Sequence, residues 1–216
     1  FFVIDDGGAT PFMATFATAA EAAAGSVADR ASFDVRDGDA RELQERAAAV
    51  ARRVAGSNAD GVVIAVADEA AASLLAHLAA GGVGTTVGRR VQVVLTSFAM
   101  TPALLLNSAR YAQGAIFPYW FDAALAADDA RLFAERFQYT YGRAAGTIEA
   151  FAYDAARAAR SLVVDEVVRR PDAAAARLSM GVAGQLFGEL RFDAAGNHQA
   201  VPRFATVAGE RFVVLE

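Results

Sequence analysis

The chain has 216 residues, of which 55% are hydrophobic, enough to build the core of one domain or of two small lobes. Its formal net charge of −5 argues against nucleic-acid binding, which needs clustered positive charge. There is no cysteine, and all 20 basic residues are arginine. Thiol catalysis, thiolate zinc sites, Schiff-base lysines and phosphate-loop lysines are therefore excluded.

Metal binding and membrane insertion are also poorly supported by the sequence. The two histidines, His77 and His198, are far apart along the chain, so we expect no multi-histidine metal site and no cofactor. No apolar run reaches the roughly 18–20 residues that a membrane-spanning helix needs. The chain opens directly on the apolar segment Phe1–Ile4, and we expect further residues to precede it in the native protein.

The first part of the chain alternates short apolar segments with helical patterns. The expected strands are residues 1–4, 32–35, 61–67, 91–96 and 114–117. The expected helices are residues 11–24, 40–56, 68–80 and 102–108. Apolar strands separated by helices predict βαβ units and a parallel sheet, which makes this part a doubly wound α/β lobe. A ligand crevice should lie beyond the carboxyl ends of its strands.

The second part is helical before strand signals return near the end. The expected helices are residues 128–141, 147–168 and 171–180. Gly142 suits a left-handed C-terminal cap, and Thr147 is the expected N-cap of the next helix, with Glu149 in its first turn. The tail carries a turn signal at Gly196-Asn197, which predicts a C-terminal hairpin.

Two motifs have a catalytic or cofactor interpretation beside a structural one. Asp5-Asp6 follows an apolar strand, as in phosphotransfer domains, but those domains need a lysine or a different acidic spacing. A polar turn before a helix is the favoured interpretation. The glycine-rich segment 82–88 follows a helix and precedes a strand. Dinucleotide-binding loops have the opposite order, so a connector is favoured.

Other enzyme signals are weak. No Gly-x-Ser-x-Gly elbow is present, and neither histidine has a serine and an acid in the context of a catalytic triad. We therefore expect no catalytic residues.

Aromatic residues are dense in the segment Tyr111–Asp122. Tyr119, Trp120 and Phe121 are consecutive, so their rings cannot all lie in one core stripe. Rings with a polar edge favour half-exposed places. We expect Tyr119 or Trp120 to contact a ligand or a partner, with packing against the following helix as the alternative.

Several motifs together resemble type I periplasmic solute-binding proteins of the branched-chain amino-acid binding kind. Tyr141-Gly142 and the helical Ala152–Ala155 (Ala-Tyr-Asp-Ala) match the late segment of that family. Phe187–Gly196 resembles its Gly-x-Leu-x-Phe-Asp-x-x-Gly hairpin, and Val207–Val213 resembles its closing strand pair. The family often has a proline in the link after Gly142, where this chain has Ala144-Ala145.

The resemblance implies a division of the chain. Residues 1–118 would form the second lobe of the binding fold, and residues 119–186 a helical segment that returns towards the first lobe. Residues 187–216 would form the C-terminal β-hairpin. On this mapping the first half of the first lobe is not in the chain, and the helices would pack either against the second lobe of the same chain or against a second copy of the chain.

Four residues that follow expected strands are candidates for the lining of a ligand cleft, and for Phe12 the family resemblance implies this role. Phe12 follows the first strand, Asp68 the third, and Ser97 and Thr101 the fourth. Each has a structural alternative: Phe12 as a core residue, and Asp68, Ser97 and Thr101 as helix-capping residues.

The implied function is solute binding for an ABC-type importer, with a small molecule such as an amino acid held without chemistry. The implied partners are a membrane permease or another envelope protein, and a second copy of the chain in a homodimer is a further predicted partner. The implied setting is the periplasm, with a lipid anchor on residues that precede the sequence. The alternative is a periplasmic lipoprotein that regulates peptidoglycan synthesis or signalling by protein contact. An enzyme is the weakest hypothesis.

Overall fold

The computed structural model describes residues 1–6, 11–34, 39–66, 68–86, 88–125, 128–164, 169–199 and 201–215. The side chains of Phe12 and Asp68 lie outside this description. The chain divides into two compact units. We call Phe1–Pro118 with Phe204–Glu216 the sheet unit, and Tyr119–Arg203 the helical unit.

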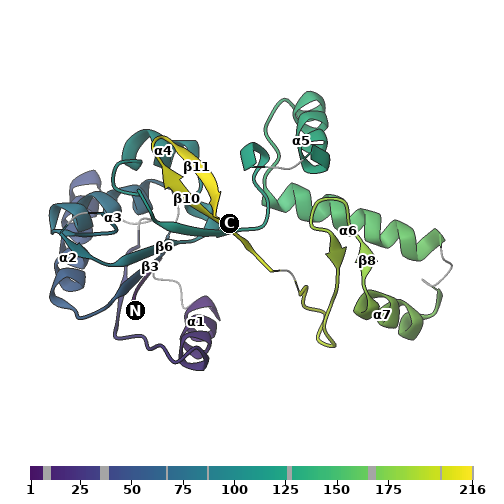
Figure 1. Cartoon of the computed structure of the whole chain (residues 1–216), viewed down its shortest axis with the longest axis horizontal. Coiled ribbons are helices and arrows are strands. Elements are labelled where there is room, and N and C mark those ends of the chain that lie inside the picture. Colours follow the sequence, from purple (N-terminus) through teal and green to yellow (C-terminus); the bar gives the residue numbers. More distant parts are fainter. Residues whose placement is uncertain are drawn as a thin grey trace. The chain divides into compact units, whose positions relative to one another are not determined.

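The sheet unit is built on one mainly parallel sheet, seen in Figure 1. In the described residues the sheet has seven strands, in the order β11-β10-β7-β6-β3-β1-β2. The strands are β1 (Phe2–Asp5), β2 (Asp29–Ser32), β3 (Gly61–Ala65), β6 (Gln92–Leu95), β7 (Ile116–Tyr119), β10 (Arg203–Ala208) and β11 (Arg211–Leu215). Strands β2, β1, β3, β6 and β7 pair in parallel, and β10–β11 is an antiparallel hairpin. The predicted α/β class, parallel sheet and C-terminal hairpin are confirmed. The hairpin turns between Ala208 and Arg211, whereas the predicted turn at Gly196-Asn197 is flanked, in the described residues, by the isolated bridge between Phe192 and His198.

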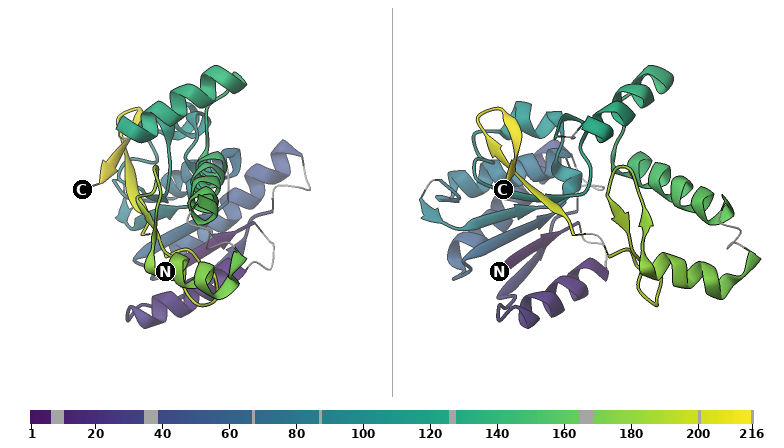
Figure 2. Two further views of the ribbon diagram at one scale, coloured as in Figure 1. Left: turned by 90° about the vertical axis from the view of Figure 1, so that its right-hand side faces the viewer. Right: turned by 45° about the vertical axis from the view of Figure 1, so that its right-hand side comes forward.

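Helices cover both faces of this sheet (Figures 1 and 2). They are α1 (Pro11–Ala22), α2 (Ala40–Gly56), α3 (Asp68–Ala80) and α4 (Pro102–Ser108). Val3 and Val63 are paired on one face and pack with Phe16 of α1. Phe2 lies on the opposite face, where the Arg53 guanidinium of α2 sits 5.7 Å from its ring centroid. Side chains alternate across the strands, so β1 and β3 are buried on both faces, as their continuous apolar sequences predict.

The second strand differs from its prediction. It occupies Asp29–Ser32, not residues 32–35, and Val35 lies outside the described residues. The strand is at the edge of the sheet, where polar residues such as Asp29 and Arg30 are tolerated. Phe33, which suggested the later position, is buried just after the strand, and its N–H donates to Asp5 O at 2.7 Å.

In the glycine-rich connector, residues 82–88, the backbone of Gly88 packs closely against that of Gly82. The connector region carries the two short parallel strands β4 (Val83–Gly84) and β5 (Arg89–Arg90). Gly88 has a φ of +59°, and a Cβ there would lie 2.0 Å from Gly82 O. Glycine is therefore required at residue 88 by backbone geometry.

The helical unit has three helices and a small antiparallel strand pair among its described residues. Its elements are a short 3₁₀ helix (Ala123–Leu125), α5 (Asp128–Tyr141), α6 (Thr147–Val164), α7 (Pro171–Met180), β8 (Val182–Ala183) and β9 (Glu189–Leu190). Phe133 is at the centre of its aromatic core, with ring centroids 5.7 Å from Phe121, 4.8 Å from Tyr153 and 6.0 Å from Phe137. The part of α6 predicted beyond Val164 lies outside the described residues.

Two cap predictions in this unit have different outcomes. Gly142 has a φ of +69°, and its N–H donates to Gln138 O at 2.8 Å, which confirms the C-terminal cap. The prediction that Thr147 is an N-cap is wrong, because Thr147 is already helical and its hydroxyl donates to Phe121 O at 3.0 Å. The Glu149 carboxylate reaches back instead and accepts the Gly146 N–H at 2.9 Å. It does so because glutamate at this position can satisfy a free donor of the first turn.

None of the helices in the described part of the chain combines the length and the hydropathy that a membrane span requires.

Candidate functional site

The carboxyl edge of the parallel sheet is the first place to seek a site. Strand order reverses between β1 and β3, and in open α/β sheets ligands bind beyond the carboxyl ends at such a reversal. This edge is polar: the Ser32 hydroxyl donates to Asp5 Oδ1 at 3.1 Å. Phe12 and Asp68 follow β1 and β3 in the chain, but their side chains lie outside the described residues.

Ser97 and Thr101 follow β6 at the same edge. Ser97 begins a one-turn 3₁₀ helix (Ser97–Ala99) and is half-buried. Thr101 is the N-cap of α4, because its hydroxyl accepts the Leu104 N–H at 3.2 Å. This bond gives Thr101 the structural role that the sequence left open. Ligand contact by either residue stays a prediction.

The three consecutive rings that begin at Tyr119, the last residue of β7, lie in different environments. Tyr119 is only 2% exposed, and Phe121 is buried in the aromatic core of the helical unit. Burial raises the pKa of the Tyr119 phenol above its ordinary value, and the neighbouring Arg203 guanidinium opposes part of this shift. Trp120 is half-buried and lines a hollow. Trp120 is therefore the better placed of the two predicted contacts.

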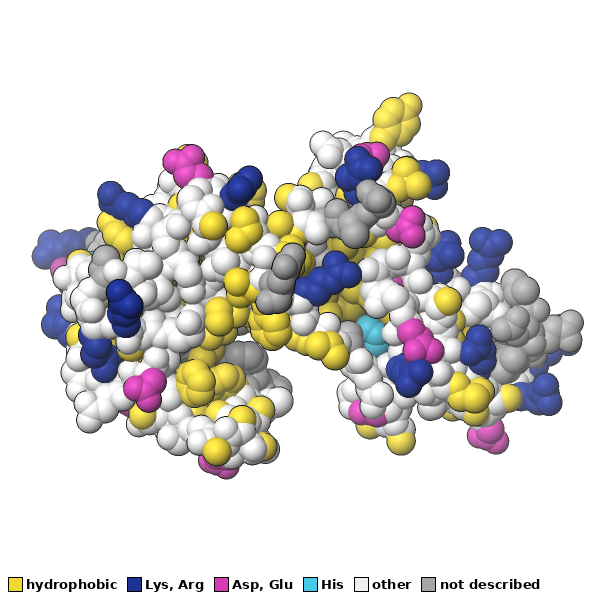
Figure 3. Space-filling view, in the orientation of Figure 1, with side chains coloured by type: hydrophobic (Ala, Val, Ile, Leu, Met, Phe, Trp, Pro, Cys, Tyr) yellow, Lys and Arg dark blue, Asp and Glu magenta, His cyan; other side chains and the backbone are white. Residues whose placement is uncertain are grey.

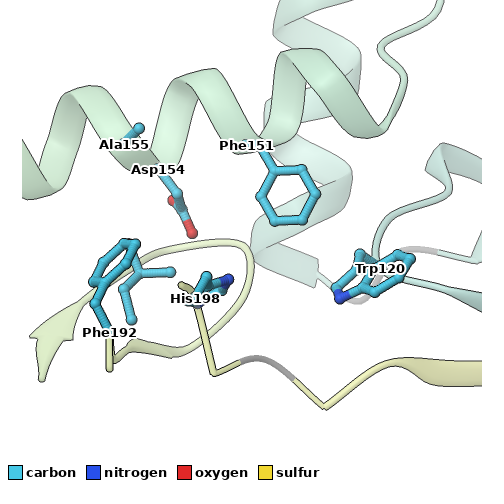
Figure 4. Close-up of a pocket in the computed structure, with 7 residues that line it drawn as sticks. Trp120, Phe151, Asp154, Ala155, Phe192 and His198 are labelled. Carbon is cyan, nitrogen blue, oxygen red and sulfur yellow. The ribbon is translucent and has the colours of Figure 1, made fainter. Parts of the chain in front are cut away.

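This hollow lies within the helical unit and has a volume of about 370 Å³, in the range of small-molecule pockets. We call it the aromatic hollow, and Figure 4 shows its lining. It is lined by Trp120, Phe151, Asp154, Ala155, Leu190, Phe192 and His198. Phe151 and Asp154 project from α6 towards the segment that carries Phe192 and His198. In this view Trp120 lies at one end of the group and Phe192 at the other.

The rings of the hollow support one another. Phe151 stacks on Phe187 with centroids 4.5 Å apart and planes 19° apart. Trp120 lies 6.4 Å from Phe151, and His198 lies 6.2 Å from it, edge-on. Because Phe187 covers one face of Phe151 and does not line the hollow, the other face of Phe151 is the one turned to it. A planar apolar group is the natural occupant.

Asp154 fixes the wall behind these rings. It is 1% exposed, and its carboxylate accepts three backbone N–H groups, from Gln185 at 2.9 Å, Leu186 at 3.0 Å and Phe187 at 3.1 Å. Charge-assisted bonds of this kind are stronger than neutral ones. We call this arrangement the Asp154 clamp. It positions Phe187, and through Phe187 it supports Phe151.

The clamp also requires glycine at residue 184. A Cβ there would lie 2.6 Å from Asp154 Oδ2 and 2.7 Å from Gly188 O. Sequence reasoning quoted Asp154 only as part of the Ala-Tyr-Asp-Ala motif and gave it no role. The available signal was an aspartate in an alanine-rich helix about thirty residues before a loop rich in glycine. The sequence analysis also gave Phe151, Phe192 and His198 no ligand role.

A smaller hollow of about 220 Å³ shares Trp120 as a wall. We call it the arginine hollow. It is lined by Trp120, Leu186, Phe187, Glu189, Gln199, Val201 and Arg203. In Figure 3, hydrophobic side chains, a histidine and basic side chains meet on the visible face of this unit. Across the described ranges, no three His, Asp or Glu side chains gather in a way that could hold a metal ion.

Comparison with solved structures places the fold. A protein assigned to branched-chain amino-acid ABC transport in Rhodospirillum rubrum matches with a TM-score of 0.74 and 20% identity, over 99% of this chain and 60% of that one. A solute-binding protein from R. palustris in complex with benzoate matches with a TM-score of 0.66 and 17% identity, over 99% and 56%. The substrate-binding protein LivJ from Streptococcus pneumoniae, in complex with isoleucine, matches with a TM-score of 0.65 and 16% identity, over 99% and 59%.

This chain thus spans 56–60% of the length of these three relatives. A search of curated proteins gave no match. The profile of the periplasmic binding protein family matches residues 5–210, which is nearly the whole chain. The chain therefore belongs to the periplasmic binding protein family.

Proposed function

We propose that this protein is the solute-binding component of an ABC-type importer and holds a small molecule, such as an amino acid, without changing it. The observation that carries the proposal is the family match over residues 5–210. Relatives of the same fold have been solved with isoleucine and with benzoate. Both are small carboxylates with an apolar body, so both belong in the first ligand panel.

Three polar side chains described above hold the structure together, which suits a site that binds a ligand reversibly. Thr101 caps a helix, Asp154 holds a loop and Ser32 bonds Asp5, so these groups are engaged in structure. What the helical unit offers a ligand is an apolar hollow with Trp120 in its wall. Such a surface binds by excluding water from the ligand.

The finer parts of the proposal follow the family. We propose a periplasmic setting, a membrane permease as the partner, and the sheet unit as the second lobe of the binding fold. Phe12, Asp68, Ser97, Thr101, Tyr119 and Trp120 remain the proposed ligand contacts. A lipid anchor and a homodimer stay predictions of the sequence analysis.

Titration calorimetry of the purified chain tests this function. The panel contains isoleucine, leucine and benzoate, and mass spectrometry of the recovered ligand checks that it is unchanged. We expect saturable binding of at least one compound. Trp120→Ala should weaken it about tenfold or more, since burying a ring against a ligand contributes more than 1.4 kcal/mol.

Tyr139→Ala is the matched control, because Tyr139 is 94% exposed on α5 and should leave binding unchanged. Conversion of a panel compound would contradict a pure binding role. Retention of an envelope protein by a chain that binds no solute would favour the regulatory alternative.

A further inference from the structure

The aromatic hollow selects for an apolar ring. Trp120, Phe151 and Phe192 supply ring walls, and His198 lies 5.3 Å from Phe192. A sugar or another polyhydroxyl compound would leave its hydroxyl groups without partners against these walls, at a cost of about 1–3 kcal/mol per group. The hollow therefore favours the ring part of a ligand.

The arginine hollow supplies a positive charge, whereas the charged residue in the lining of the aromatic hollow is Asp154, an acid. Arg203 is exposed, and its guanidinium has the Tyr119 phenol as a neighbour. It forms no ion pair with a carboxylate of the described residues. A guanidinium presents a planar fork of donors that matches a carboxylate.

The acidic side chains nearby are already paired. Glu189 forms an ion pair with Arg191 at 2.8 Å, and the Asp154 carboxylate is held by three backbone N–H groups. An ammonium group in either hollow would have to compete with these partners. A simple carboxylate is therefore favoured over a zwitterion.

We propose that the two hollows together bind an aromatic monocarboxylate, with its ring in the aromatic hollow and its carboxylate on Arg203. This inference rests on the proposed function and names the ligand class of the helical unit. Trp120 lines both hollows. In this arrangement it packs against the part of the ligand that connects its ring to its carboxylate.

The test uses phenylacetate, with three comparison compounds. Phenylacetamide keeps the shape and loses the charge, cyclohexylacetate loses the aromatic ring, and phenylalanine adds an ammonium group. We expect phenylacetate to bind about three- to tenfold more tightly than each of them at low salt, as one partly exposed charge-assisted contact or ring contact provides.

Arg203→Gln should weaken phenylacetate about three- to tenfold and leave phenylacetamide unchanged, because only the charged ligand uses the guanidinium. Arg169→Gln is the matched control, since Arg169 is an exposed arginine of the same unit. Phe192→Leu keeps an apolar wall, removes one ring and should weaken phenylacetate and phenylacetamide equally.

Four results would overturn the inference. Equal affinity for phenylacetate and phenylacetamide would remove the role of charge. Phenylacetate binding that neither Arg203→Gln nor Phe192→Leu alters would place the ligand elsewhere. Binding of isoleucine without any binding of phenylacetate would reject the ligand class and leave the proposed function standing, whereas both proposals fail if no compound of either panel binds.

Discussion

The sheet unit and the helical unit position their buried residues by different means. In the sheet unit, parallel backbone ladders fix Val62 and Ile64, which are fully buried, beside the residues of β1. In the helical unit, the backbone of the loop between β8 and β9 is held by the Asp154 carboxylate through three hydrogen bonds, and the Tyr153 hydroxyl adds one bond to the Gln185 side chain at 2.9 Å. A ladder spreads the stabilisation over many weak bonds, whereas the clamp concentrates it in one carboxylate. The helical unit should therefore be the more sensitive to a single polar substitution.

The sharpest test of this difference is to remove the clamp. Asp154→Ala leaves three backbone donors without their acceptor, and the Leu186 N–H is buried. We expect a loss of about 3–5 kcal/mol from the unfolding free energy of the helical unit. Asp154→Asn keeps one oxygen acceptor and should lose about half as much.

Trp120 is the only tryptophan of the chain and lies in the helical unit, so denaturant unfolding followed by its fluorescence reports on this unit. Asp172→Ala, at an exposed aspartate in the first turn of α7, is the control. It should cost less than about 1 kcal/mol. Equal unfolding free energies of Asp154→Ala and Asp172→Ala would show that the Asp154 clamp does not stabilise the helical unit.

The second test compares the two cores. Leu74 of α3 is 0% exposed, and Leu74→Ala should cost the sheet unit about 2–5 kcal/mol through lost burial and a cavity. Phe133→Leu in the helical unit keeps much of the volume but loses three ring contacts, so we expect a smaller loss of about 1–2 kcal/mol. Native-state hydrogen exchange, read separately for the two units, measures both. A larger loss for Phe133→Leu would show that ring geometry outweighs volume.

The smallest expected effect concerns acid. In the sheet unit, the pKa of Asp29 is lowered by the hydrogen bond from the Arg30 backbone N–H and then by Arg53. In the helical unit, the pKa of Asp193 is lowered first by the hydrogen bond from the Asn197 side chain. A lowered folded pKa gives stability that is present above the ordinary aspartate pKa and is lost as the pH falls through the folded value.

Both groups are exposed, so the change should be slight. Asp29→Asn should reduce the loss of stability at acid pH in the sheet unit alone. Asp193→Asn should do the same in the helical unit alone. Carboxyl titration by NMR gives the two pKa values directly, and ordinary values at both positions would contradict the expectation.

Local chemistry explains why much of the fold could be predicted. The helices at residues 68–80, 102–108, 128–141 and 171–180 have the predicted bounds. Pro102 and Pro171 mark helix starts, and Gly142 follows a helix end, so one residue is enough to predict each of these boundaries. Strand β2 was misplaced because Asp29 and Arg30 occupy an edge strand, where burial no longer constrains residue type.

The candidate site was less accessible to sequence reasoning. Trp120 could be named because three consecutive rings cannot share one environment. Asp154, by contrast, acts on a loop about thirty residues later, and Phe151 meets the ring of His198, which comes from a later segment of the chain. Partners at such distances depend on the tertiary fold, so a local pattern does not reveal them.

The route of the chain has a consequence for how the protein is made. The whole of Tyr119–Arg203 is inserted between β7 and β10, which are neighbours in the sheet. A ribosome therefore completes the helical unit while β7 still presents an unpaired edge, and such edges promote association with other chains. The edge of β7 is closed only when β10 pairs with it. Next to this pairing, Gln113 Nε2 donates to Gly209 O at 2.7 Å, and Gly209 N–H donates to Gln113 Oε1 at 3.0 Å. A chain that stalls before Arg203 would keep β7 open, so aggregation during synthesis should depend on how quickly the final segment emerges.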